Sequence, residues 1–117
     1  MTDTYSAIAE INVQTLAQRL ATDPDAIQLI DVREPHEVEV ASIDSFINLP
    51  LSQFPAWSPT ISSQFDPAAE TIVMCHAGMR SAQMCQWLMN QGFTNVSNLA
   101  GGIDAYSRQI DPSIPIY

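Results

Sequence analysis

One segment of the chain, Cys75–Ser81, combines residue types at a spacing that suits sulfur chemistry. It follows an uncharged, β-rich run and precedes a helical pattern, so we expect Cys75 at the carboxyl end of a parallel strand, where open α/β sheets bind ligands. Gly78 allows a turn whose successive backbone N–H groups point inward, and the positive end of the next helix favours a thiolate there. Arg80 adds a permanent charge. The segment therefore predicts a cradle for a reactive sulfur and an anionic group.

The elements that must position this segment are short β-type runs alternating with longer helical patterns. This alternation indicates an α/β fold, a parallel sheet covered by helices on both faces. The patterns predict strands at 9–11, 27–30, 46–49, 71–74 and 96–99, and helices at 12–20, 81–90 and 103–108. Asn12 is expected to cap the first helix, and Gly101-Gly102 to form the turn into the last. Prolines between positions 51 and 67 leave room for one or two short helices there.

Composition limits the class of protein. The chain has 117 residues, of which 46% are hydrophobic, so it fits one compact domain and is not expected to be disordered. Thirteen acidic side chains against four arginines give a net charge of −9. Such a field repels phosphate backbones and anionic lipid headgroups, so neither nucleic acid nor a membrane is an expected partner.

The expected location is the cytoplasm. The first twenty residues have no basic start and no signal-like apolar run, and no uncharged apolar run approaches the roughly 20 residues that span a bilayer. Cys75 and Cys85 are too few for a disulfide scaffold and suit a reducing compartment. They show no zinc-type spacing with the histidines, so no metal is expected. Cys85 is predicted to pack on the apolar face of its helix, with a resolving thiol as the alternative.

Four motifs in register resemble the single-domain rhodaneses, a family of sulfurtransferases. They are Asp31–Glu37, Ile47–Leu51, Cys75–Ser81 and Leu99–Ile103. The resemblance runs from about Ile11 to Tyr106 and implies a five-stranded parallel sheet with helices on both faces. It implies one rhodanese-like domain over 1–117, with a core at about 9–108, a short N-terminal lead and a C-terminal tail.

The resemblance also implies roles for individual residues. Cys75 is the expected nucleophile and persulfide carrier, without a cofactor. Arg80 is expected to close the loop and bind the anionic part of the donor, and Asp31 and Arg33 are expected to support the loop's neighbourhood. The residues whose backbone would cradle the outer sulfur are His76, Ala77, Gly78, Met79 and Arg80.

Loop length separates two chemistries within this fold. Four residues lie between Cys75 and Arg80, whereas the related phosphatases and arsenate reductases have one more. The tighter ring fits a sulfur atom better than a tetrahedral phosphate. The chain departs from the family at Ala41–Phe46, where Gly-His-Ile-Pro-Gly-Ala is common, and at Tyr106, where Trp is frequent. These departures concern the rim of the pocket and the substrate it accepts.

The expected reaction is a double displacement. The Cys75 thiolate takes a sulfane sulfur from a donor such as thiosulfate and passes it to a thiophilic acceptor. A free thiol titrates near about pH 8.5, and a pKa lower by one or two units stabilises the thiolate by roughly 1.4 to 2.8 kcal/mol. Because the protein is acidic, we expect weak thiosulfate affinity, and a basic protein or a thiol carrier as physiological partner.

Two other classes of function remain open from the sequence. One is a binding or regulatory module that keeps the fold without turnover, and the other is a phosphatase or arsenate reductase. The cluster Glu34, Glu37 and Glu39 is expected to form a solvated acidic face, with a docking surface for a basic partner as the alternative.

Overall fold

The computed structural model describes residues 8–117, and its centre is a five-stranded parallel sheet. The predicted N-terminal lead lies mostly outside the described residues. The strands follow the order β1-β5-β4-β2-β3, and every neighbouring pair is parallel. They are β1 (Ala9–Ile11), β2 (Gln28–Asp31), β3 (Ile47–Asn48), β4 (Thr71–Met74) and β5 (Val96–Leu99). The predicted α/β class and parallel sheet are confirmed, with strand boundaries within one residue of those expected.

Helices connect the strands as the sequence pattern predicts, with one addition. The α-helices are α1 (Val13–Thr22), α2 (Pro35–Val40), α3 (Phe54–Trp57), α4 (Ile61–Gln64), α5 (Met79–Asn90) and α6 (Gly102–Gln109). Three short 3-10 helices are η1 (Pro24–Ala26), η2 (Leu51–Gln53) and η3 (Ser58–Thr60). Helix α2 was not predicted. Helix α5 begins at Met79, two residues before the expected Ser81, and Gly78 is its N-cap.

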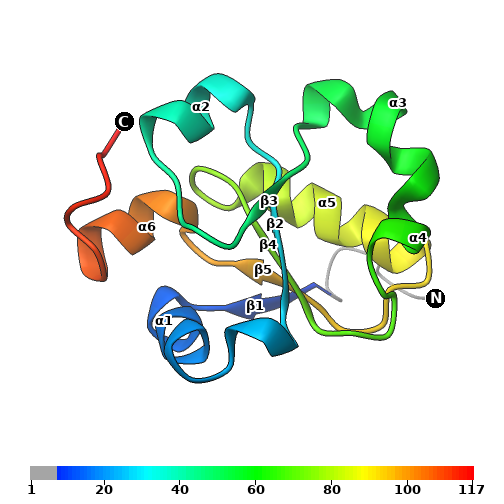
Figure 1. Cartoon of the computed structure of the whole chain (residues 1–117), viewed down its shortest axis with the longest axis horizontal. Helices are drawn as coiled ribbons and strands as arrows, with labels where there is room; N and C mark the ends of the chain where they lie inside the picture. The colour runs from blue at the N-terminus through cyan, green and yellow to red at the C-terminus, as the bar shows by residue number, and fades with distance from the viewer. Residues whose placement is uncertain (1–7) are drawn as a thin grey trace.

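Two hydrophobic clusters lie on opposite faces of the sheet, beneath the helices that Figure 1 shows on its two sides. Helices α3, α4 and α5 cover one face, and the cluster there contains Val73, Trp57 and Leu88. Helices α1 and α6 cover the other, where Ile72, Leu16 and Tyr106 are buried. Successive β4 residues point to opposite faces, so a strand covered on both sides must be apolar throughout. This explains why 71–74 is the most apolar run of the sheet.

Strand β4 is central, since it pairs with β2 on one side and with β5 on the other. Cys75, which follows β4 directly, therefore has neighbouring strand ends on both sides. Asp31 closes β2 and Leu99 closes β5 at the same edge. The sheet thus brings the motifs at 31–37, 75–81 and 99–103 together at its carboxyl edge.

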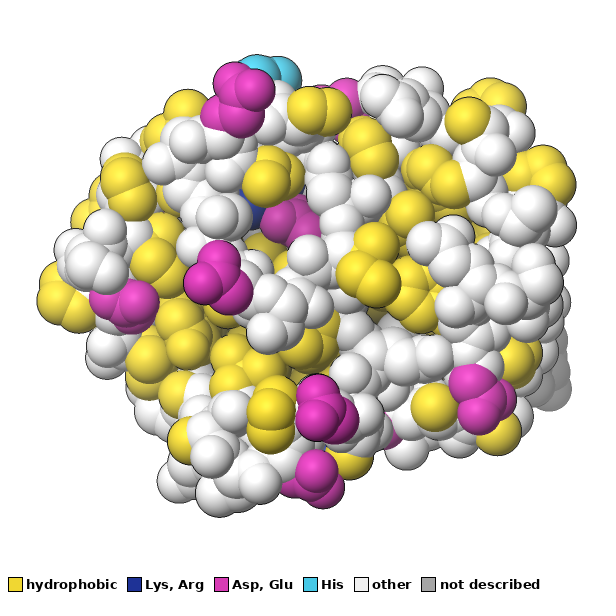
Figure 2. Space-filling model, viewed as in Figure 1, with side chains coloured by type: hydrophobic (Ala, Val, Ile, Leu, Met, Phe, Trp, Pro, Cys, Tyr) yellow, Lys and Arg dark blue, Asp and Glu magenta, His cyan; other side chains and the backbone are white. Residues whose placement is uncertain are grey.

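The surface reflects the acidic composition. On the face seen in Figure 2, acidic side chains are spread widely, while dark blue basic surface is confined to a small area. None of the helices within residues 8–117 is long and apolar enough to cross a bilayer. The C-terminal tail returns toward α2 (Figure 1), and Ile114 joins the cluster under α1 and α6.

Candidate active site

The sulfur of Cys75 lies inside the turn between β4 and α5. Cys75 is only 1% exposed, yet polar donors face its sulfur. The Gly78 amide donates to Sγ at 3.1 Å, and Ser81 Oγ lies 3.3 Å from Sγ. Gly78 has φ +111°, in the region that favours glycine, and this turns its amide inward. The sulfur is therefore hidden from bulk water but surrounded by groups that stabilise an anion.

Hydrogen bonding sets the acidity of this thiol. Burial alone raises the pKa of Cys75, but donation from the Ser81 hydroxyl and from the amides of Ser81, Gly78 and Ala77 outweighs burial. The net effect lowers the pKa of Cys75 below its ordinary value. Donors aimed at a sulfur favour its charged form because that form accepts hydrogen bonds more strongly. The site therefore favours a thiolate, the nucleophilic form of cysteine.

Ser81 connects the sulfur to β5. Its hydroxyl lies 2.5 Å from Asn98 Oδ1 as well as 3.3 Å from Cys75 Sγ, and one hydroxyl proton serves one acceptor at a time. The Ser81 hydroxyl is thus within donor distance of both the sulfur and the Asn98 amide oxygen. Asn98 also holds the loop directly, because its Nδ2 donates to the Gly78 carbonyl at 3.0 Å.

The start of α6 fixes the loop from the other side. The amides of Ile103 and Asp104 donate to the carbonyls of Cys75 and His76, each at 3.0 Å. This approach is possible only because Gly102 has no side chain: a Cβ there would lie 2.4 Å from the His76 carbonyl oxygen. The double glycine is thus more than a turn, since it lets one helix terminus bind the backbone of the loop.

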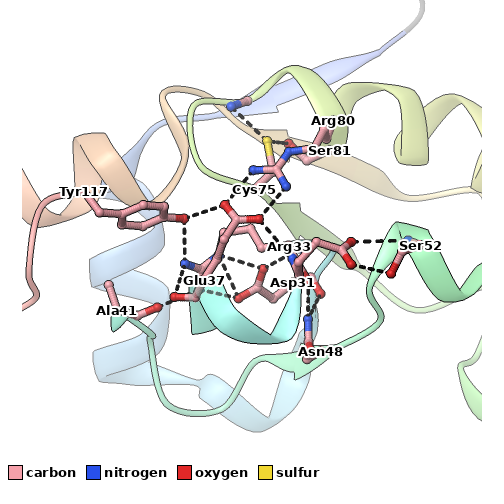
Figure 3. A network of polar contacts seen from close by, with 12 residues as sticks. Asp31, Arg33, Glu37, Ala41, Asn48, Ser52, Cys75, Arg80, Ser81 and Tyr117 are labelled. Carbon is pink, nitrogen blue, oxygen red and sulfur yellow. Dashed lines mark hydrogen bonds and ion pairs between the residues drawn. The ribbon is translucent and has the colours of Figure 1, made fainter. Parts of the chain in front are cut away.

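Arg80 does not point into open solvent or stand alone beside the sulfur. Its two terminal nitrogens donate to the two carboxylate oxygens of Glu37, at 2.7 and 2.9 Å. In Figure 3 the guanidinium lies between this carboxylate and the Cys75 sulfur. The Arg80 pair lowers the pKa of Glu37 to about 2, although partial burial opposes this. The expectation of a solvated acidic face is therefore wrong for Glu37, whose side chain is 12% exposed.

Arg33 positions the helix that carries Glu37. Its guanidinium is fully buried, forms a bidentate pair with Asp31, and donates to the Glu37 and Ala41 carbonyls at the end of α2. Asn48 Nδ2 in turn donates to the carbonyls of Asp31 and Arg33. The Asp31 and Arg33 motif thus holds α2 in place, and α2 reaches the loop through Glu37. Figure 3 shows this chain of contacts.

The C-terminal Tyr117 joins both parts of the network. Its hydroxyl accepts from Arg33 Nη1 and donates to Glu37 Oε2, each at 2.9 Å. Its ring stacks on the imidazole of His76 with centroids 4.2 Å apart. His76 Nε2 lies 4.0 Å from Asp104 Oδ1. The imidazole therefore faces the tail and α6.

The other predicted residues differ in exposure. Ala77 and Met79 lie on the outside of the loop, and Met79 is 80% exposed. Cys85 is fully buried on α5, and burial raises its pKa to about 12, so its thiol stays protonated. This fits packing better than a resolving role. Within the described part of the chain, no group of three or more His, Cys, Asp or Glu side chains is placed to hold a metal ion.

Sequence reasoning gave no individual role in the site to four residues that contribute to it. They are Glu37, Ser81, Asn98 and Tyr117. Asn98 carried a signal, since it is a polar residue in a strand next to the central one, where a buried amide needs partners. Ser81 ends the loop motif itself. Glu37 ends the motif at 31–37 and has capping-box spacing from Glu34, but neither feature pointed to Arg80. Tyr117 had no signal, because its contacts depend on how the tail folds back.

Residues 12–109 match the sequence model of the Rhodanese-like domain family. A chloroplastic Rhodanese-like/PpiC domain-containing protein 12 of Arabidopsis thaliana is 48% identical over 113 residues, which cover 94% of this chain and 38% of that protein. A sulfurtransferase of Allochromatium vinosum is 37% identical, and the match covers 86% of this chain and 90% of that protein. The chain thus spans less than half of the first relative and nearly all of the second.

A solved structure shows the same fold. The rhodanese-related protein from Thermoplasma volcanium superposes with a TM-score of 0.73 at 27% identity. The match covers 93% of this chain and 99% of that one. The expected resemblance and fold are therefore confirmed, while the roles given to individual site residues stay predictions.

Proposed function

Because the chain belongs to the rhodanese-like domain family, some of whose matching members are sulfurtransferases, we propose that it transfers sulfane sulfur through a persulfide on Cys75. The donor is a small sulfane compound of the thiosulfate type, and the acceptor is a thiophilic nucleophile. The observation that carries the proposal is the Cys75 sulfur, 3.1 Å from the Gly78 amide, with a pKa below its ordinary value.

The first half-reaction forms one sulfur–sulfur bond and breaks another. The Cys75 thiolate attacks the outer sulfur of thiosulfate, and the old sulfur–sulfur bond breaks with its electron pair leaving on sulfite. The charges balance, since a thiolate and a dianion give a persulfide anion and sulfite dianion. In the second half-reaction, a nucleophile takes the outer sulfur and the thiolate returns.

The loop amides have the same task in both steps. An anion is present on the cysteine at the start and on the persulfide afterwards, and preorganised donors stabilise charge where it develops. Ser81 supplies an adjustable donor, because its hydroxyl can turn between Asn98 and the sulfur.

The test is mass spectrometry after incubation with thiosulfate. We expect an adduct of one sulfur atom on Cys75, which disappears on addition of cyanide or a thiol and is absent in Cys75→Ser. Cys85→Ser is the matched control and should load as the native chain does. No adduct on Cys75 with either thiosulfate or a sulfane donor of single negative charge, or an adduct that persists in Cys75→Ser, would overturn the proposal.

Two rival functions predict other results. A binding or regulatory module would form no persulfide under these conditions. A phosphatase would hydrolyse a phosphate ester, but the four-residue interval between Cys75 and Arg80 and the engagement of Arg80 by Glu37 both weigh against a phosphate site. A phosphate-ester assay run beside the sulfur-transfer assay separates a sulfurtransferase, a binding module and a phosphatase.

A further inference from the structure

Glu37 occupies the donor groups of the arginine expected to bind the donor's anionic part. Arg80 directs one N–H of each terminal nitrogen at this carboxylate in a bidentate pair. Bidentate pairs between arginine and a carboxylate are the strong, directional kind. Because the Glu37 side chain is only 12% exposed, water screens the pair weakly on the carboxylate side.

The remaining surroundings of Glu37 reinforce this arrangement. Its oxygens also accept from the Glu34 amide at 3.0 Å and from the Tyr117 hydroxyl at 2.9 Å. Arg33 fixes the helix beneath it by bonds to the Glu37 and Ala41 carbonyls. The carboxylate is therefore held in place by groups other than Arg80, and it cannot simply swing away when an anion approaches.

The formal charges of the side chains near the sulfur show what an approaching anion meets. Arg80 contributes one positive charge and Glu37 cancels it, while Arg33 is cancelled by Asp31. The Cys75 thiolate adds a negative charge. A dianion that reaches this site thus meets a net negative neighbourhood, and must either share Arg80 with Glu37 or displace it.

We propose that Glu37 determines the donor class: it neutralises Arg80 and so makes the site prefer sulfane donors of a single negative charge, such as thiol persulfides or thiosulfonates, over dianionic thiosulfate. The inference rests on the proposed sulfur transfer and adds the choice of donor. For a thiol persulfide, the Cys75 thiolate attacks the outer sulfur, and the donor thiolate leaves with the bonding pair. For a thiosulfonate, a sulfinate leaves instead.

The experiment compares two donors that differ by one charge at similar size, thiosulfate and methanethiosulfonate. The rate constant for loading Cys75 is measured with each donor in the native chain and in Glu37→Gln. Gln keeps an oxygen for the Glu34 amide but removes the charge. We expect Glu37→Gln to increase loading by thiosulfate about tenfold relative to methanethiosulfonate, since a unit repulsion close to a dianion is removed.

Glu39→Gln is the matched control, because Glu39 is exposed on the same helix and its substitution changes the net charge equally. Glu39→Gln should keep the native ratio of the two rates. A ratio in Glu37→Gln equal to the native one would overturn the role of Glu37 and leave the proposed sulfur transfer standing. Failure of both donors to load the native chain would overturn the sulfur transfer itself.

A measurement on the pair itself covers the case in which Glu37→Gln does not fold. The guanidinium ¹⁵N resonances of Arg80 are followed in Cys75→Ser while thiosulfate is added. We expect them to stay unchanged at donor concentrations that load the native chain with methanethiosulfonate. A saturable shift at those concentrations would overturn the inference, because it would mean that the dianion takes Arg80 from Glu37.

Discussion

At the scale of single residues, the acidity of Cys75 results from a competition. Burial disfavours the thiolate, and a ring of amides with one hydroxyl favours it, with the second effect larger. An apolar pocket of the same depth would produce an inert thiol, as at Cys85, where burial raises the pKa to about 12. Two buried cysteines in one core cluster thus differ because of the donors around each sulfur.

Ser81→Ala removes the adjustable donor and leaves the amides. We expect the pKa of Cys75 to rise, because a donor that stabilises the thiolate is lost while the burial that disfavours it remains. Loading at neutral pH falls accordingly, while loading well above the pKa is nearly native. The pH dependence of iodoacetamide alkylation, measured on Cys85→Ser, reports the shift. An unshifted profile would mean that the amides alone set the acidity.

The ion pair between Glu37 and Arg80 makes stability depend on acid. In the folded protein the pKa of Glu37 is about 2, below its ordinary value of 4.5. The contribution of the pair to stability is therefore fully present above pH 4.5 and is lost as the pH falls toward 2. Glu37→Gln should therefore cost about 2 kcal/mol at pH 7, a figure reduced for the solvent exposure of Arg80. Urea unfolding of both proteins between pH 7 and 2.5 should show the difference shrinking. A constant difference would assign the cost to the capping of α2 instead.

At the scale of elements, the position of the loop at 75–81 depends on the N-terminus of α6, which packs against the backbone of that loop. The close approach of α6 requires Gly102, whose Cβ would fall 2.4 Å from a backbone oxygen that cannot move alone. Gly102→Ala should destabilise the fold by about 3 kcal/mol or more and disturb the Cys75 carbonyl. Gly92→Ala is the control, since Gly92 also has positive φ but no atom within 4 Å. It should cost only about 1 kcal/mol, and equal costs in thermal unfolding would contradict this account.

The connection between α2 and β3 contains a strained position. Ser45 has φ +83° and is the one non-glycine with positive φ among residues 8–117. It stands where the rhodanese pattern commonly has glycine. Ser45→Gly should stabilise the chain by about 1 kcal/mol, because Ser45 is exposed and loses little else. A rise in the midpoint of thermal unfolding checks this, with exposed Ser42→Gly as a control that should not stabilise.

How much of this architecture was predictable differs between elements. The strands at 9–11, 71–74 and 96–99 coincide with the predicted ones, because β-type runs between polar turns are a local property of the sequence. Helix α2 was missed because it has only six residues and no buried face. Its signals are at its start, where Pro35 occupies the first turn and Glu34 and Glu37 form a capping box.

The residues of the candidate site also differ in how far the sequence could predict them. The loop residues were predictable from a motif of adjacent positions. The partner of Arg80 was not, since Glu37 lies 43 positions away and meets it only after α2 folds over the sheet edge. Tyr117 is farther still from the residues it joins, 84 positions from Arg33.

At the scale of the whole molecule, two electrostatic effects act on an anionic donor at different ranges. The net charge of −9 acts over the distance that salt permits, about 10 Å at 0.1 M ionic strength and about 30 Å at 0.01 M. The Glu37–Arg80 pair acts only near the sulfur. Salt therefore weakens the first effect and leaves the second nearly unchanged.

This difference in range predicts how loading depends on salt. We expect the thiosulfate rate constant to rise several-fold between 0.01 and 0.15 M ionic strength, because like-charge repulsion during approach is screened. Methanethiosulfonate, with one charge, should show roughly half that slope on a logarithmic scale. Glu39→Gln should lower both slopes slightly, whereas Glu37→Gln should also change the donor ratio that remains at high salt. If thiosulfate loading instead slows as salt is added, attraction by Arg80 outweighs the net charge of the protein, and Glu37 does not neutralise it.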